Sequence, residues 1–153
     1  MEHHAGTLVL GENKRWKQDC DMGSQNNQNF VSMPTGLLKQ MIIYKASDAG
    51  IKTIMQEESY TSQADITAMD YIPVYGVDAE NAVFSGRRIS RSLYRCFNGM
   101  IINADCNGAA NIMRKAITDA WNSITDFSFL ASPEVSGFHE PVSYTHLTLP
   151  TKA

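Results

Sequence analysis

The stretch from residue 101 to 124 constrains the fold more than any other part of the chain. Two isoleucines lead into a polar turn at Asn103 and Asp105, and apolar residues then recur every three or four positions. Such spacing is typical of an amphipathic helix with one buried face. We therefore expect a short strand and then a long helix, whose apolar positions are Ala109, Ile112, Met113, Ala116, Ile117, Ala120, Trp121 and Ile124.

The polar turn before this helix has two interpretations. Either Asn103 or Asp105 can serve as the N-cap, because both side chains accept hydrogen bonds from the first-turn amides. A carboxylate at the positive end of a helix dipole is also a suitable ligand for Mg²⁺, which prefers oxygen ligands. The spacing alone leaves both roles open for Asp105.

The first third of the chain has the pattern of a strand, a helix and a second strand. Residues 7–10 form a short apolar run that ends at Gly11, an amphipathic segment runs from Thr35 to about residue 49, and residues 51–55, Ile-Lys-Thr-Ile-Met, are expected to form the next strand. Two strands joined by a crossover helix lie parallel in one sheet. Glu57 and Glu58 follow the second strand, so we expect their carboxylates at the carboxyl edge of that sheet, where open α/β folds bind ligands.

The composition is that of one soluble domain. The chain has 153 residues, of which 43% are hydrophobic and 19% charged, and no apolar run is long enough to cross a membrane. Its three cysteines are odd in number and form no C-x-x-C pair. This usage favours a reducing compartment, and we expect a cytoplasmic protein without disulfides.

Positive charge is concentrated in one part of a chain whose net charge is −3. Between residues 84 and 116 there are six basic residues and one acidic residue. A local cluster of this kind is either a solvated face or a contact surface for phosphates. Its basic residues are Arg87, Arg88, Arg91, Arg95, Arg114 and Lys115.

Several motifs, in a fixed order, resemble one protein family. They are Gly11-Glu12-Asn13-Lys14-x-Trp16-Lys17-Gln18, Glu57-Glu58-Ser59-Tyr60-Thr61-Ser62-Gln63, Phe84-Ser85-Gly86-Arg87-Arg88-Ile89 and Asn103-Ala104-Asp105-x-Asn107-Gly108-Ala109-Ala110-Asn111-Ile112. The chain resembles, over roughly residues 5 to 130, the RuvC-like nuclease part of TnpB (OrfB) proteins. These are RNA-guided endonucleases encoded by insertion sequences and related to type V CRISPR effectors.

The resemblance implies a two-metal Mg²⁺ centre held by three carboxylates. Asp105 matches the last of them. The first, an aspartate, would lie upstream of Met1, so the chain resembles a C-terminal fragment that is inactive alone. Most relatives carry the second carboxylate where this chain has Gly11, but a rearranged subset supplies it just before the Tyr-Thr-Ser motif. Glu58 then becomes the expected ligand, with Glu57 second and Glu12 a weaker candidate.

The resemblance also implies nucleic-acid partners, a target DNA and a guide RNA. Relatives carry a zinc ribbon made of two C-x-x-C pairs in the region 59–100, whereas this chain has Ala64 and a single Cys96 there. Because a tetrahedral site needs four ligands, we expect no zinc. The arginines at 87, 88, 91 and 95 become candidate phosphate contacts. Trp16, with Lys14 and Lys17, is expected either to stack on a base or to fill the core.

These observations predict an α/β fold, a partial RuvC or ribonuclease H-like domain with an irregular insertion. We expect the RuvC-like part at 1–58 and 101–126, the insertion at 59–100, and a tail at 127–153. Residues 142–153 resemble translated sequencing-adapter read-through and are excluded from the fold. The predicted parent activity is metal-dependent, RNA-guided DNA cleavage linked to a transposable element. The alternatives are a non-catalytic nucleic-acid-binding module and a decayed transposase remnant.

Overall fold

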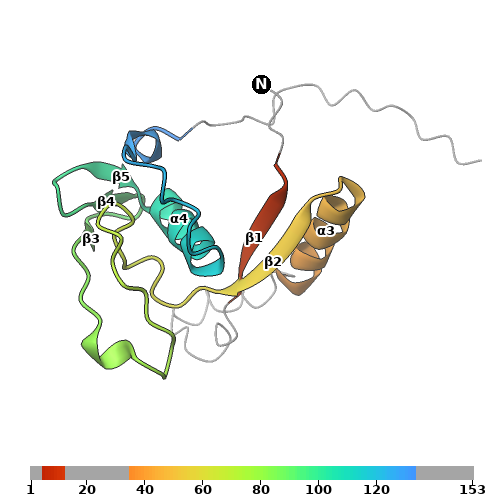
Figure 1. Cartoon of the computed structure of the whole chain (residues 1–153), viewed down its shortest axis with the longest axis horizontal. Coiled ribbons are helices and arrows are strands. Elements are labelled where there is room, and N and C mark those ends of the chain that lie inside the picture. Colours follow the sequence, from red (N-terminus) through yellow and green to blue (C-terminus); the bar gives the residue numbers. More distant parts are fainter. Residues whose placement is uncertain (1–4, 13–34, 134–153) are drawn as a thin grey trace, which may run out of the picture.

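The structure is a computed structural model that describes residues 5–12 and 35–133 (Figure 1). It contains two small sheets, and helix α4 (Ala104–Ala116) lies between them and packs against both. The predicted mixed α/β class is confirmed. Within the described residues, none of the helices is long and apolar enough to serve as a membrane span.

The first sheet has the predicted strand–helix–strand arrangement. Strand β1 (Thr7–Glu12) pairs in parallel with β2 (Lys52–Glu57), and helix α3 (Thr35–Asp48) connects them. The helix ends at Asp48, and Gly50 follows it with a φ of +73°, which permits the left-handed turn that most residues avoid. The register joins Gly11 to Gln56 and Glu12 to Glu57, so the carboxyl ends of both strands meet at one edge.

Helix α3 covers this sheet only partly. Its predicted apolar face was expected to be buried, but among the helix residues only Ala46 is buried, while Leu38 and Met41 are 51% and 55% exposed. No residue of β1 or β2 is fully buried either. In the described part of the chain the main core therefore lies elsewhere, on the other side of α4.

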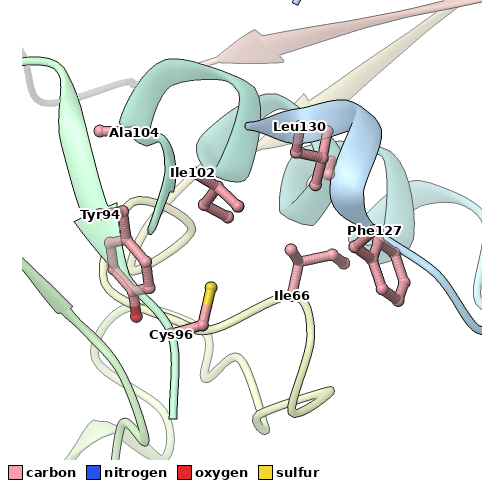
Figure 2. Packing of buried hydrophobic residues seen from close by; sticks show 8 residues of the cluster. Ile66, Tyr94, Cys96, Ile102, Ala104, Phe127 and Leu130 are labelled. Atoms are coloured by element: carbon pink, nitrogen blue, oxygen red, sulfur yellow. The ribbon is translucent and has the colours of Figure 1, made fainter. Parts of the chain in front are cut away.

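The second sheet is antiparallel and is built from three short strands, β3 (Arg87–Arg88), β4 (Leu93–Arg95) and β5 (Ile101–Asn103). The main hydrophobic core, shown in Figure 2, lies between the inner face of this sheet and helix α4. Ile66 joins it from the loop before the sheet, and Phe127 and Leu130 join it from the segment after α4. The buried side chains of this core are Ile66, Tyr94, Cys96, Ile102, Ala104, Ala110, Phe127 and Leu130.

Helix α4 begins as predicted but ends earlier. Asn103 is the N-cap, and its side chain accepts hydrogen bonds from the amides of Asp105 and Cys106. The prediction that the helix continues to residue 124 is wrong, because it ends at Ala116 and Ile117 is extended. The chain then folds back, so that the Trp121 indole donates to the carbonyl of Ala110 at 2.9 Å. Trp121 and Ile124 thus reach the core from outside the helix.

The end of the described chain also contributes to the core. Phe127 and Leu130 lie in the range that the sequence assigned to a tail, yet each is only 6% exposed. Phe127 directly precedes the short 3₁₀ helix η2 (Ser128–Leu130), and Leu130 is its last residue. This helix packs against β5. A second 3₁₀ helix, η1 (Ala79–Asn81), lies between β2 and β3 in the order of the chain.

Residues 59–86 contain little regular structure, and buried polar side chains hold them in place. Asn107 accepts from the amide of Ile66 at 3.2 Å and donates to the carbonyl of Ala64 at 2.8 Å. Asn111 donates to the same carbonyl and to that of Thr61. Buried backbone groups without a regular ladder need such partners, so these two amides replace secondary structure.

We expect Asn107→Ala to lower the free energy of unfolding by about 1–3 kcal/mol, because the buried amide of Ile66 loses its acceptor. Urea denaturation followed by circular dichroism measures this change. Asn122→Ala, at an exposed position beyond α4, is the matched control and should change little. Equal stability of the two variants would contradict the structural role given to Asn107.

Candidate functional site

The Glu58 carboxylate lies directly over the end of β1. A Cβ at Gly11 would collide with a Glu58 carboxylate oxygen and would lie 3.1 Å from Cδ1 of Ile112 on α4. Only glycine leaves room for this approach. The expectation that parallel strands bring Gly11 and Glu58 together is therefore confirmed. Glu58 has no hydrogen-bond or ion-pair partner for its carboxylate within the described residues.

Glu57 is occupied by neighbouring groups. It forms an ion pair with Lys115 of α4, and the amide of Ser59 donates to its Oε1 at 2.7 Å. Burial of Glu57 opposes ionisation, but the hydrogen bonds from Lys115 and Ser59 outweigh it and keep the pKa of this carboxyl below its ordinary value. Glu57 therefore acts as the anchor of Lys115, and of these two carboxylates Glu58 is the one whose oxygens bind no other described residue.

Asp105 is in the first turn of α4 and is highly exposed, with 84% of its side chain accessible. Because Asn103 provides the cap, the cap interpretation of Asp105 is not needed to explain the helix start. Its carboxylate oxygen lies 3.5 Å from a guanidinium nitrogen of Arg88, a contact that is exposed on both sides. Exposed pairs of this type contribute little to stability.

Asp105 and Glu58 lie on different elements, and Ile112 of α4 relates their positions. Asp105 and Ile112 are seven residues apart and share a helix face, with their Cα atoms about 10 Å apart along the axis. Ile112 in turn lies near Glu58 through Gly11. Across the described ranges, no three His, Cys, Asp or Glu side chains gather closely enough to hold a metal ion. Glu12, at the end of β1, faces Glu57 across the sheet.

The predicted phosphate-contact arginines gather on and beside the β3–β4 hairpin, and all four are exposed. Arg87 lies directly opposite Arg95 in the register, an arrangement that is unfavourable unless an anion is nearby. Arg87, Arg91 and Arg95 form no ion pair with any carboxylate that the structure describes. The other three predicted contacts, Lys14, Trp16 and Lys17, lie outside the described residues.

The predicted insertion at 59–100 is held by two buried aspartates, which the sequence did not single out. Asp65 accepts hydrogen bonds from the amides of Thr67 and Phe97, at 2.9 and 2.7 Å. Asp70 accepts from the amides of Asp65 and Ser85. Each carboxylate thus joins segments far apart in the chain. The spacing Asp-x-Thr is a signal for such a turn, but nothing local shows that it is buried.

Cys96 lies beside this network in the core. Burial, with the nearby Asp65, raises the pKa of its thiol to about 11, against a smaller opposing effect of Thr67. The thiol is therefore protonated at neutral pH and packs as a small apolar side chain. Cys96 and Cys106 are both free cysteines.

Arg114 and Lys115 of α4 face a separate surface pocket. Its volume is about 390 Å³, and its lining includes Asp70 and Tyr71. Arg114 donates to the carbonyl of Asp70 at 2.6 Å and to Oδ1 of Asn111 at 3.1 Å. Burial lowers the pKa of Arg114, although the charges of Asp70 and Asp65 oppose this. Both cations therefore serve mainly to fix the loop before the second sheet.

We expect the stability to depend on pH through Glu57. Its pKa is lowered in the folded state, so the stabilisation is complete above the unfolded value near 4.5 and is lost as pH falls through the lower folded value. Urea denaturation between about pH 6 and pH 3 should show this loss of unfolding free energy. The loss should be smaller in Lys115→Met, which lacks the partner of Glu57. Glu80→Gln, an exposed control on η1, should leave the pH dependence unchanged. An identical pH profile for Lys115→Met would contradict the pairing.

Comparisons with known proteins identify related sequences. The sequence model of the "Cas12f1-like, TNB domain" family matches residues 36–112, which include β2, all of the second sheet and most of α4. The chain is also 37% identical over 93 residues to the CRISPR-associated endodeoxyribonuclease Cas12f1 of Sulfoacidibacillus thermotolerans. That alignment covers 60% of this chain and 18% of the relative, so the chain spans a small part of the relative's length.

The matched region contains the Tyr-Thr-Ser segment, the arginine hairpin and the Asn-Ala-Asp turn, which are the motifs on which the predicted relationship depends. The predicted kinship with TnpB-type proteins and type V effectors is thereby confirmed. The chain belongs to the Cas12f1-like TNB domain family.

Proposed function

We propose that this chain forms part of an RNA-guided, divalent-metal-dependent DNA endonuclease of the type associated with transposable elements. The named activity of the Cas12f1 relative, an endodeoxyribonuclease, supports this proposal. Glu58 and Asp105 supply two of the metal-binding carboxylates, and Mg²⁺ is the ion that such oxygen ligands suit. When bound, the metal pair would activate water and stabilise the leaving oxygen of a phosphodiester.

The observation that carries the proposal is the position of Glu58. Its carboxylate lies over Gly11 at the carboxyl edge of the parallel strands, has no partner among the described residues, and is next to the α4 stripe that begins at Asp105. The edge of a parallel sheet is also where α/β folds bind their ligands.

The partners in this proposal are a target DNA and a guide RNA. The exposed arginines of the β3–β4 hairpin contact phosphates, and such contacts set affinity and salt dependence without choosing the sequence. Arg88 links the two functions, because it belongs to this hairpin and lies against Asp105. We expect nucleic acid to be held on the same side of α4 as the carboxylates.

A non-catalytic nucleic-acid-binding module is the second candidate. It is favoured by the ion pair between Arg88 and Asp105, which gives that carboxylate a partner other than a metal. In such a module Asp105→Ala leaves DNA binding intact and no divalent ion binds. The two candidates therefore differ in metal binding, and a metal titration separates them.

We expect Mn²⁺, used as a probe for Mg²⁺, to bind the chain through Asp105 and Glu58. Asp105→Asn or Glu58→Gln should each weaken binding about tenfold or more, because each removes one anionic ligand. Electron paramagnetic resonance of free Mn²⁺ measures the affinity, and Glu80→Gln is the matched control. Unchanged affinity in both site variants would reject the metal site.

The candidate set holds two carboxylates on separate elements, whereas the two-metal mechanism uses three. We therefore expect no cleavage of plasmid or single-stranded DNA by this chain alone above background in Mg²⁺. Robust cleavage abolished by Asp105→Ala would overturn that expectation and place a complete centre within these residues.

We expect Arg91→Ala to weaken binding of a DNA oligomer and to reduce its salt dependence. Each lost phosphate contact lowers the slope of log K against log salt by about 0.7 to 0.9. Fluorescence anisotropy at several salt concentrations measures this slope. Lys52→Ala, at an exposed position on β2, is the control with the same change in charge. A slope equal to that of the control would remove the hairpin from the interface.

A further inference from the structure

Three aromatic rings from different parts of the loop region lie nearly parallel to one another. The ring of Tyr60 is stacked with that of Tyr75, with centroids 6.5 Å apart and an angle of 17° between the planes. It is also stacked with Phe84, at 6.3 Å and 23°. Tyr60 is thus common to both pairs. We call these three residues the ring group.

Tyr60 holds its position in a strained backbone conformation. Its φ is +63°, in the left-handed region that bulky residues rarely adopt. Its carbonyl accepts from the amides of Gln63 and Ala64, so the turn that follows depends on this conformation. Strain of this kind persists where the surroundings impose it, and it is concentrated at functional sites.

The loops that carry the ring group are held by hydrogen bonds rather than by regular structure. Lys115 donates to the carbonyls of Ser59 and Pro73, and so joins the segments that bear Tyr60 and Tyr75. Asp78 accepts from the amide of Val74 at 2.8 Å, which closes the turn around Tyr75. The rings are therefore arranged before any ligand arrives, which lowers the entropic cost of binding.

The segment that bears Phe84 is fixed in the same way. The amide and hydroxyl of Ser85 both donate to the buried carboxylate of Asp70, at 2.8 and 2.5 Å. Asp70 also accepts from the amide of Asp65, which follows the turn of Tyr60. One buried network thus positions two of the three rings relative to each other.

The loops that carry the ring group also bear exposed apolar side chains. Tyr75 is 48% exposed, and Val77 and Val83 are 77% and 81% exposed. The charged side chains in this loop, Asp78 and Glu80, are acidic. Among the described residues, this loop therefore offers ring faces and apolar contacts, while the nearby cation, Lys115 of α4, is engaged by the carbonyls of Ser59 and Pro73. Such faces suit the flat sides of unpaired bases, which stack on aromatic rings regardless of sequence.

We infer that the ring group is a stacking platform for unpaired bases of a single-stranded nucleic acid. Tyr60 is two residues after Glu58 in the chain. A nucleic-acid strand whose bases stack on the ring group therefore has its backbone close to this candidate metal ligand. This inference rests on the proposed function, because it is that function which brings nucleic acid to this edge. It divides binding into two parts, with bases on the ring group and phosphates on the arginine hairpin.

The two parts can be separated with two labelled oligomers of equal charge, oligo-dT of about 12 nucleotides and an abasic phosphodiester of the same length. We expect the full chain to bind oligo-dT more tightly. Tyr75→Ala should weaken oligo-dT binding at least about fivefold, the lower end for one stacked base, and should not change abasic binding. Its salt slope should equal that of the wild type, whereas Arg91→Ala should lower the slope for both oligomers.

Tyr75→Phe keeps the ring and should restore wild-type affinity. Tyr44→Ala, which removes an exposed ring from α3, is the matched control and should have no effect. Phe84→Ala provides a second test, and the urea midpoint of each variant shows that it is folded.

Equal affinity of Tyr75→Ala and wild type for oligo-dT, with Arg91→Ala still weakened, would overturn the platform and leave the proposed function standing. Equal binding of the two oligomers by the wild type would overturn it as well. An affinity lost equally for both oligomers in Tyr75→Ala would assign this surface to the backbone or to folding, against the inference. Failure of the chain to bind either oligomer at low salt would reject both proposals.

Discussion

Side chains on one stripe of α4 hold the structure together. Asn107, Asn111 and Lys115 are spaced four residues apart and bind backbone carbonyls of the segment between β2 and the second sheet. That segment has almost no regular structure of its own, so its buried carbonyls and amides depend on these partners. Without α4, neither the turn after Glu58 nor the loops of the ring group would have a defined position.

The same helix connects stability with the candidate function. Lys115 neutralises Glu57, whereas the neighbouring Glu58, over Gly11, has no carboxylate partner in the part of the chain that the structure describes. At its other end Asn103 takes over the capping of the helix, so Asp105 is not required for that task. In both places a neighbouring residue satisfies the structural need, and the remaining carboxylate is left with oxygens that a metal could use.

Much of the fold and part of the candidate site could be predicted from the sequence. The parallel strand pair, its crossover helix and the meeting of Gly11 with Glu58 follow from hydrophobic periodicity and the geometry of the βαβ unit. The roles of buried Asp65 and Asp70 could not be predicted, because their partners at Phe97 and Ser85 lie far along the chain. A carboxylate in a turn gives no local sign of whether it faces water or the core.

The sequence by itself determined the strand–helix–strand order of the first third, the strand and helix at the Asn-Ala-Asp turn, and which residues follow the strand ends, since these depend on spacing and on turn residues. Only the tertiary structure decided that α4 stops at Ala116, because burying Trp121 against the core outweighs a helical pattern that continues beyond it. It also decided that Glu57, and not Glu58, pairs with Lys115 and that Tyr60 lies against two distant rings. Such choices depend on contacts between residues remote in the chain, and no local pattern encodes them.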